Sequence, residues 1–251
     1  MRSARLALLA LLGLAPLAIA VRQATVSDSL GSPAPAAALD WSELSSAGFT
    51  AFAQRFAGAG ARATRDEQDE LIRVALSGEG EIPTRATVLL GLVAASDGPG
   101  ASPRARTGLL LVLSARAPVE GRENVGRTIV AARALRGAAA EDAGLRDDLL
   151  ALVSGETRHP DLPTRVECAY TLCEAGAARE VLPFLLSVLR AETPDQAKSP
   201  RTWERITTLA WVKTRAAEAL TRAARTELRF HPDASWAAQM QEANRLEALL
   251  R

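Results

Sequence analysis

The feature that most constrains this 251-residue chain is a short pattern that recurs at intervals of roughly 40 residues. An acidic residue is followed four positions later by a basic one, and small or apolar residues follow at three, four and seven positions beyond that. The clearest copy is Asp161 and Arg165, followed by Cys168, Ala169 and Leu172. Residues at these spacings share one face of an α-helix. Recurrence at this interval is typical of stacked helical hairpins, because no single unit can bury its own apolar face.

The basic residues of the four copies are 42, 38 and 48 positions apart: Arg85, Arg127, Arg165 and Lys213. In three copies the acid four positions earlier predicts a structural ladder of ion pairs. The members of this ladder are Glu81, Arg85, Glu123, Arg127, Asp161 and Arg165. In the fourth copy Leu209 stands in place of the acid, so we expect Lys213 to be unpaired and available to a partner.

Between about residues 65 and 226 the chain resembles the HEAT-repeat family, in which a turn joins two helices and the second opens with an acid four residues before an arginine. The matching residues are Asp161/Arg165, Glu81/Arg85 and Glu123/Arg127, with Gly176 at the turn out of the second helix. The resemblance implies an α-solenoid of stacked antiparallel helix pairs, with the helices that carry the basic residues along its inner, concave surface. It implies no activity.

Composition and periodicity support an all-α fold. Aromatic residues make up only 4% of the chain, and its many alanines favour helices that pack closely through small side chains. A helix from Trp41 to about Gly58, with Phe49, Phe52 and Phe56 on its apolar side, is expected to cap the first repeat. The further helices are expected at 65–77, 84–96, 104–115, 123–138, 145–154, 163–175, 180–191, 202–226 and 235–250.

The first 20 residues have the pattern of a signal peptide. Two arginines precede an apolar run, and the triplet Ala18-Ile19-Ala20 suits cleavage after Ala20. The alternative is an uncleaved anchor, although the run is shorter than the ~20 residues of a spanning helix. Residues 21–39 are expected to form a flexible linker and residues 40–251 one helical domain. These features predict a periplasmic or secreted protein that contacts a membrane only if the leader is retained.

Removal of the leader leaves 28 basic and 29 acidic residues, and this near-neutral balance argues against nucleic-acid binding. Cys168 and Cys173 lie five apart on one expected helix, too far to bridge, so we interpret them as buried free thiols. His159 and His231 each precede a proline in a loop, and we expect both to be exposed. Neither the histidines nor the cysteines have the spacing of a metal or cofactor site.

Trp203 and Trp211, eight residues apart on one expected helix, pack in the core or form an aromatic anchor for a partner. Together with Lys213 they are the candidate partner-binding residues. We therefore expect an exported, non-catalytic repeat protein that acts as a protein-binding or scaffold module and needs no cofactor. The alternatives are an enzyme or enzyme-accessory subunit on a similar scaffold, as in bilin-lyase relatives of this repeat type, and a structural subunit of a cell-envelope assembly.

Overall fold

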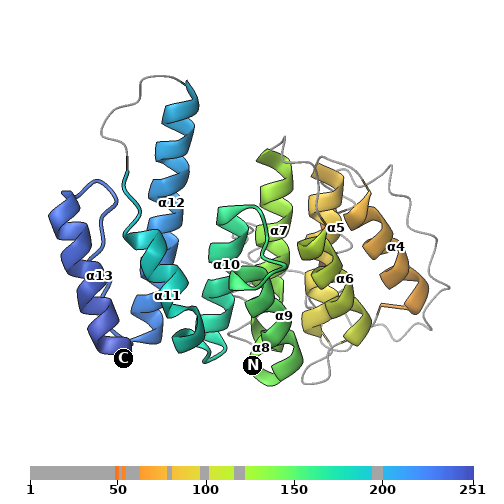
Figure 1. Ribbon diagram of the computed structural model, residues 1–251. Helices are drawn as coiled ribbons and strands as arrows, with labels where there is room; N and C mark the ends of the chain where they lie inside the picture. Colours follow the sequence, from red (N-terminus) through yellow and green to blue (C-terminus); the bar gives the residue numbers. More distant parts are fainter. Residues whose placement is uncertain are drawn as a thin grey trace, which may run out of the picture. The chain divides into compact units, whose positions relative to one another are not determined.

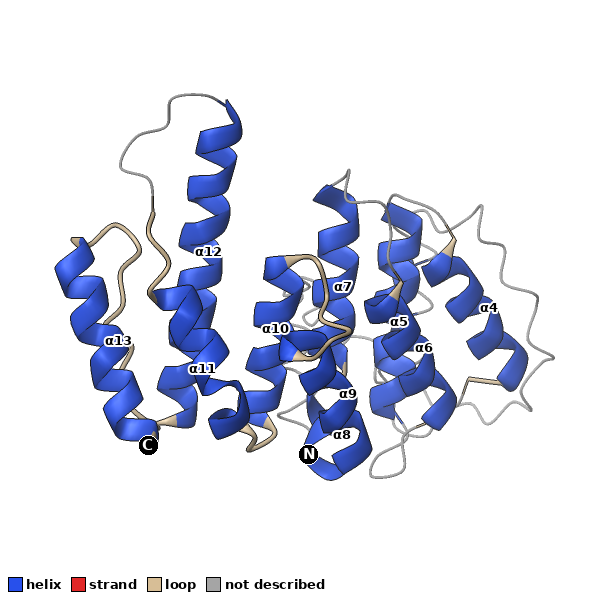
Figure 2. Ribbon diagram, in the orientation of Figure 1, coloured by secondary structure: helices blue, strands red, loops and turns tan. Residues whose placement is uncertain are grey.

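The structure is a computed structural model that describes residues 49–50, 53–54, 63–77, 81–96, 102–115, 122–193 and 200–251. Every element named within these ranges is an α-helix, so the all-α class is confirmed for this part of the chain (Figures 1 and 2). None of the described helices is long and apolar enough to cross a bilayer. The expected leader at 1–20, the linker at 21–39, and Phe52 and Phe56 of the capping helix lie outside the described residues.

The described helices fall into two compact units, and the boundary at Val112 lies in the last turn of α6. The first unit contains α4 (Arg65–Leu76), α5 (Glu81–Ser96) and most of α6 (Pro103–Ser114). The second contains α7 (Arg122–Ala134), α8 (Arg136–Glu141), α9 (Ala143–Ser154), α10 (Leu162–Glu174), α11 (Ala178–Leu189), α12 (Pro200–Ala223) and α13 (Trp236–Leu250). A single domain over residues 40–251 stays a prediction.

Two helix boundaries differ from expectation in an instructive way. The helix expected at 123–138 is two helices, because Leu135 (ψ −5°) interrupts the regular backbone and α8 begins without a side-chain cap. The helix expected from residue 84 begins at Glu81, so Pro83 lies inside its first turn. A proline is tolerated there because the first N–H groups of a helix have no intrahelical acceptor.

In the first unit, α4 begins with the expected capping box. The Thr64 hydroxyl accepts from the Glu67 N–H at 3.3 Å, and the Glu67 carboxylate accepts from the Thr64 N–H at 2.7 Å. The helices α4 and α5 pack along one another. The helix α6 approaches both so closely that a Cβ on Gly108 would overlap the Ile72 side chain and lie 3.0 Å from Leu90 Cδ2.

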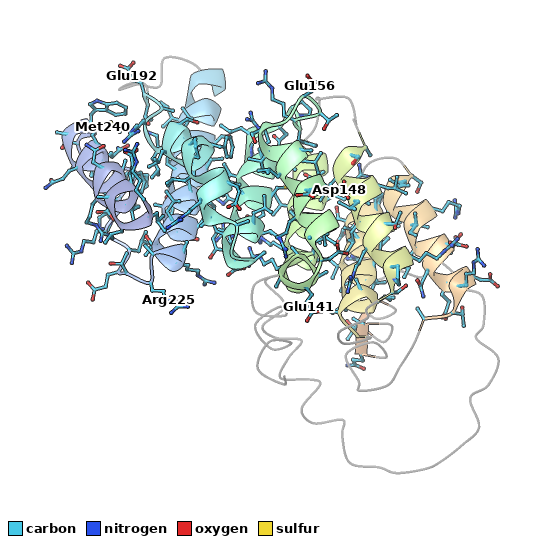
Figure 3. All side chains as sticks on the ribbon, turned by 60° about the horizontal axis from the view of Figure 1, so that its bottom comes forward. Glu141, Asp148, Glu156, Glu192, Arg225 and Met240 are labelled. Atoms are coloured by element: carbon cyan, nitrogen blue, oxygen red, sulfur yellow. The ribbon has the colours of Figure 1, made fainter. Side chains whose placement is uncertain are left out.

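In the second unit, α10 is the central element. It packs beside α7 and α12 in one row, and against α9 and α11, which with α13 form a second row. Its apolar face is buried, with Leu172 1% exposed, so the expected core position of this residue is confirmed. Charged side chains such as Glu141, Asp148 and Arg225 lie on the outside of the helices (Figure 3).

The ends of α10 follow the sequence pattern. Asp161 caps its start by accepting from the Thr164 N–H at 2.8 Å, and Gly176 ends it with φ +87°. The Ala177 N–H donates to Leu172 O at 2.9 Å across this turn, which is the Schellman arrangement. A left-handed residue is needed there, and glycine adopts that backbone without steric cost.

Candidate functional site

Of the three expected ion pairs of the ladder, one forms, one involves a side chain outside the described ones, and one is replaced by other contacts. Glu81 pairs with Arg85 on α5. Arg127 on α7 is buried, and the Glu123 side chain lies outside the described ones. The expected Asp161–Arg165 pair is wrong. The Asp161 carboxylate accepts from Thr164, whereas the Arg165 Nε–H donates to Val153 O at 2.8 Å and the guanidinium carbon lies 4.6 Å from the Phe184 ring centroid.

The expectation of an unpaired, accessible Lys213 is also wrong, because this residue has no exposed surface. Its ammonium donates to Thr193 Oγ1 at 2.9 Å and to Gln239 Oε1 at 3.0 Å, and it lies 5.3 Å from the centroid of the Trp236 ring. Burial lowers the pKa of Lys213, and no described carboxylate pairs with it. Lys213 therefore links α12 to α13 and to Thr193, which lies in the segment after α11.

The tryptophan side chains differ in their exposure to solvent. Trp211 is partly exposed on α12, the side chain of Trp203 lies outside the described ones, and Trp236 is 46% exposed at the start of α13. An aromatic contact surface around Trp211 stays a prediction.

The two cysteines and His159 are buried, whereas His231 is exposed, as expected. Cys168 and Cys173 are free, buried thiols, as expected, and burial raises the pKa of both to about 12. His159 is buried, contrary to expectation, because the loop before α10 folds back and its N–H donates to Leu152 O at 2.9 Å. Its Nδ1 accepts from the Asp161 N–H at 3.1 Å, and burial lowers its pKa. The described His, Cys, Asp and Glu residues include no group of three or more that could hold a metal ion.

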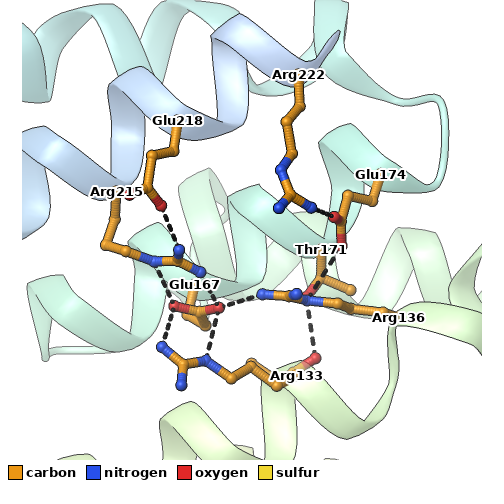
Figure 4. A network of polar contacts seen from close by, with 9 residues as sticks. Arg133, Arg136, Glu167, Thr171, Glu174, Arg215, Glu218 and Arg222 are labelled. Atoms are coloured by element: carbon orange, nitrogen blue, oxygen red, sulfur yellow. Dashed lines mark hydrogen bonds and ion pairs between the residues drawn. The ribbon is translucent and has the colours of Figure 1, made fainter. Parts of the chain in front are cut away.

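The most concentrated polar chemistry is an arginine–glutamate cluster on the row formed by α7, α10 and α12, together with α8. Figure 4 shows Glu167 of α10 between three guanidinium groups. Arg133 donates to its carboxylate at 3.0 and 3.3 Å, Arg136 at 2.5 Å, and Arg215 at 2.8 and 3.2 Å. Glu167 has no exposed side-chain surface. One carboxylate thereby links four helices.

A second carboxylate extends the cluster toward the surface. Glu174, two turns after Glu167 on α10, receives Arg222 Nη1 at 2.7 Å and lies 3.2 Å from Arg136 Nε (Figure 4). The buried Arg136 Nε–H nevertheless has no hydrogen-bond acceptor among the described residues, because the approach is poorly aligned. On α12, Glu218 accepts from Arg215.

Tyr170 lies within this cluster. Its residue is 1% exposed, and the guanidinium carbons of Arg215, Arg136 and Arg222 lie 4.2, 4.5 and 5.6 Å from its ring centroid. Cations over an aromatic face are attracted by its quadrupole, more so when water is excluded.

The protonation state of the cluster follows from these contacts. Burial acts to raise the pKa of Glu167, but hydrogen bonds from Arg133 and Arg215 outweigh it and hold the pKa below its usual value. Burial raises the pKa of Tyr170, so its hydroxyl stays a hydrogen-bond donor at neutral pH. By count of side chains, the cluster has one more arginine than glutamate, four against three.

Sequence analysis missed this cluster, although its signal is present. Glu167 and Glu174 are seven apart on the expected helix at 163–175, and Arg215 and Arg222 are seven apart on the helix at 202–226, so each pair shares a face. Glu167 also stands between Val166 and Cys168 in a largely apolar stretch of that helix, and a charge buried there needs partners.

Comparison with protein-family models, with curated proteins and with solved structures finds no match to this chain.

Proposed function

We propose that the chain is an exported, non-catalytic α-solenoid of the HEAT type that acts as a protein-binding or scaffold module. The observation that carries the proposal is the order of helix contacts in the second unit. The helices α7, α10 and α12 lie in one row, α9, α11 and α13 in another, and each step along the chain adds one helix to a row. Repeated stacking of this kind produces extended surfaces suited to partner binding.

The row of α7, α10 and α12 is the surface we assign to the partner. These are the helices that the HEAT resemblance implies for the concave side. On α12 the positions 211, 215, 218 and 222 fall on one helical face, so the partly exposed Trp211 continues the line of Arg215, Glu218 and Arg222. Tryptophan and arginine are enriched at the energetically dominant positions of protein interfaces.

A binding role suits the described chemistry better than a catalytic one. A nucleophilic cysteine needs a low pKa, whereas both thiols are buried with raised pKa values. The His159 ring accepts a backbone hydrogen bond inside the loop before α10.

The test of binding is capture of a protein by the immobilised chain from residue 21 onward, followed by reconstitution of the purified pair. We expect Trp211→Ala and Arg222→Glu to abolish the complex, whereas Arg229→Glu, an exposed arginine outside the row, leaves it intact. A complex that survives both substitutions in the row, or no stoichiometric complex with any captured protein, contradicts the proposal.

The test of export is the mass of the protein purified from its native envelope fraction. Cleavage after Ala20 gives a mature chain that begins at Val21. A mass that includes residues 1–20 instead supports an anchored protein and rejects cleavage.

A further inference from the structure

The arginine–glutamate cluster leaves several hydrogen-bond donors without a protein acceptor. The Tyr170 hydroxyl makes no hydrogen bond to any described residue, although the residue is almost completely buried. Arg222 uses only Nη1, on Glu174, and Arg136 uses Nη2 on Glu167 while its Nε–H is unsatisfied. Buried polar groups normally have hydrogen-bond partners, so the buried, unsatisfied Nε–H of Arg136 requires an explanation.

These donors surround one ring. The guanidinium carbons of Arg136 and Arg222 lie 4.5 and 5.6 Å from the Tyr170 ring centroid, and both side chains meet at Glu174. The side chain of Arg222 is 58% exposed, whereas that of Arg136 is 11% exposed. The cluster is therefore open to solvent at Arg222 and nearly closed at Arg136, whose buried Nε–H has no acceptor.

The balance of charge agrees with the balance of donors. Glu167 is enclosed and fully used by Arg133, Arg136 and Arg215, so it leaves no acceptor for the outer part of the cluster. In that outer part, Arg136 and Arg222 share the single carboxylate of Glu174. Guanidinium groups bind carboxylate and phosphate oxygens with strong, charge-assisted hydrogen bonds.

We propose that Tyr170, Arg136 and Arg222 form an oxyanion-binding site that receives an acidic side chain of a protein partner. This assignment rests on the binding function proposed for the same row of helices. The carboxylate accepts from the Tyr170 hydroxyl and from the free Nε–H and Nη2–H groups of Arg222, and Arg136 supplies the second positive charge. Glu174 holds the two arginines in place.

Two substitutions separate the site from the fold. Tyr170→Phe removes the unpaired hydroxyl but keeps the ring on which the arginines pack. Arg222→Gln removes the exposed cation and leaves Glu167 with all its partners. Arg229→Gln is the matched control, because Arg229 is similarly exposed at 63% and contacts only Glu227. Thermal melts equal to wild type are required of all three variants.

The probe is a decapeptide of glutamate, titrated calorimetrically at low salt, with inorganic phosphate as a second probe. We expect Kd for the peptide to increase about tenfold in Tyr170→Phe and in Arg222→Gln and to stay unchanged in Arg229→Gln. Stronger binding of phosphate than of the peptide assigns the site to phosphate and overturns the acidic-side-chain proposal. Equal peptide affinity in all variants, or no binding by wild type, also overturns it.

Capture of the protein partner distinguishes this inference from the broader function. If Tyr170→Phe captures the partner as wild type does while Trp211→Ala does not, the row of helices binds the partner but the oxyanion site does not exist. If every variant in the row captures the partner equally, the binding function proposed for that row fails as well.

Discussion

Arg225 follows α12 with φ +52°, and it is the one described residue other than glycine with a positive φ. It occupies the same place as Gly176 after α10: its N–H donates to Arg222 O at 3.1 Å, and the next N–H donates to Thr221 O at 3.1 Å. The left-handed backbone costs an L-residue energy because Cβ approaches the carbonyl oxygen.

We therefore expect Arg225→Gly to stabilise the protein by about 0.5–1 kcal/mol, after allowance for the greater freedom of glycine in the unfolded chain. Denaturant titration measures the change. Arg225→Ala is the control, since it removes the same exposed side chain but keeps Cβ, and it should give no gain. Equal effects of the two substitutions would rule out backbone strain as the cause.

Lys213 shows what a missing acid means inside a core. Leu209, four residues earlier, is buried beside it, and the base of this copy is fully enclosed without an acid on its own turn. The aliphatic part of the Lys213 side chain is buried, and its ammonium group donates to the neutral oxygens of Thr193 and Gln239.

We expect Lys213→Ala to cost about 2–4 kcal/mol through the cavity it opens, and Lys213→Met, which retains the volume, to cost less.

Because the folded pKa of Lys213 is lowered, the unfolded chain binds more protons between that pKa and 10.5, so this residue makes stability rise with pH there. Cys168, Cys173 and Tyr170 act in the opposite direction, since their pKa values are raised. The measurement is therefore the difference in free energy of unfolding between wild type and Lys213→Met. As pH rises from 7 to about 10, the wild type should become more stable relative to Lys213→Met.

At the scale of elements, Glu167 joins α7, α8, α10 and α12 through one carboxylate. We expect Glu167→Gln to destabilise the protein by about 3–5 kcal/mol, because a neutral amide deprives three largely buried arginines of the carboxylate they share. The control Glu218→Gln, which removes a partly exposed partner of Arg215 alone, should cost less than about 1 kcal/mol.

The pH dependence of the same pair of proteins is a second measurement. The folded pKa of Glu167 lies below its usual value of 4.5, so its contribution is present above pH 4.5 and is lost as pH falls through the folded pKa. Acidification should therefore reduce the difference in free energy of unfolding between wild type and Glu167→Gln. If this difference in free energy stays constant until the protein unfolds in acid, Glu167 does not have a lowered pKa in the folded protein.

The close approach of α6 to α4 and α5 depends on one position without a side chain. We expect Gly108→Ala to cost about 1–3 kcal/mol through overpacking against Ile72. Gly126→Ala on α7 is the counterpart, because nothing lies within 4 Å of its Cβ, and it should stabilise by about 0.5–1 kcal/mol. Chemical denaturation measures the free energy of unfolding of both variants. An increase in Gly108→Ala as well as in Gly126→Ala would show that α6 can shift to accommodate the added methyl group.

Sequence periodicity predicted the elements better than their contacts. Local signals such as Thr64 with Glu67, Asp161 at the start of α10 and Gly176 at its end act within one turn, and each takes its expected place. The fate of Arg165, Lys213 and His159 depends on residues 12 or more positions away or on a loop that folds back, and no local pattern contains that information.

At the scale of the whole molecule, the two compact units give a testable expectation about opening. Hydrogen exchange in Glu167→Gln should accelerate at amides of α7 to α13 and leave α4 and α5 as in wild type, whereas Gly108→Ala should do the reverse. If either substitution accelerates exchange throughout the described helices, the units do not open separately.

The cluster at Glu167 has a consequence for the nascent chain. Arg133 and Arg136 have already been synthesised when Glu167 leaves the ribosome, but Arg215 follows 48 residues later. Until α12 arrives, one side of α10 presents a carboxylate whose full set of cations is incomplete, and burying it is unfavourable. Domains usually begin to fold from the N-terminal end during synthesis. In this chain we instead expect the second unit to complete its fold only once α12 is available, so a nascent chain stalled before residue 215 should leave α10 exposed to chaperones and proteases.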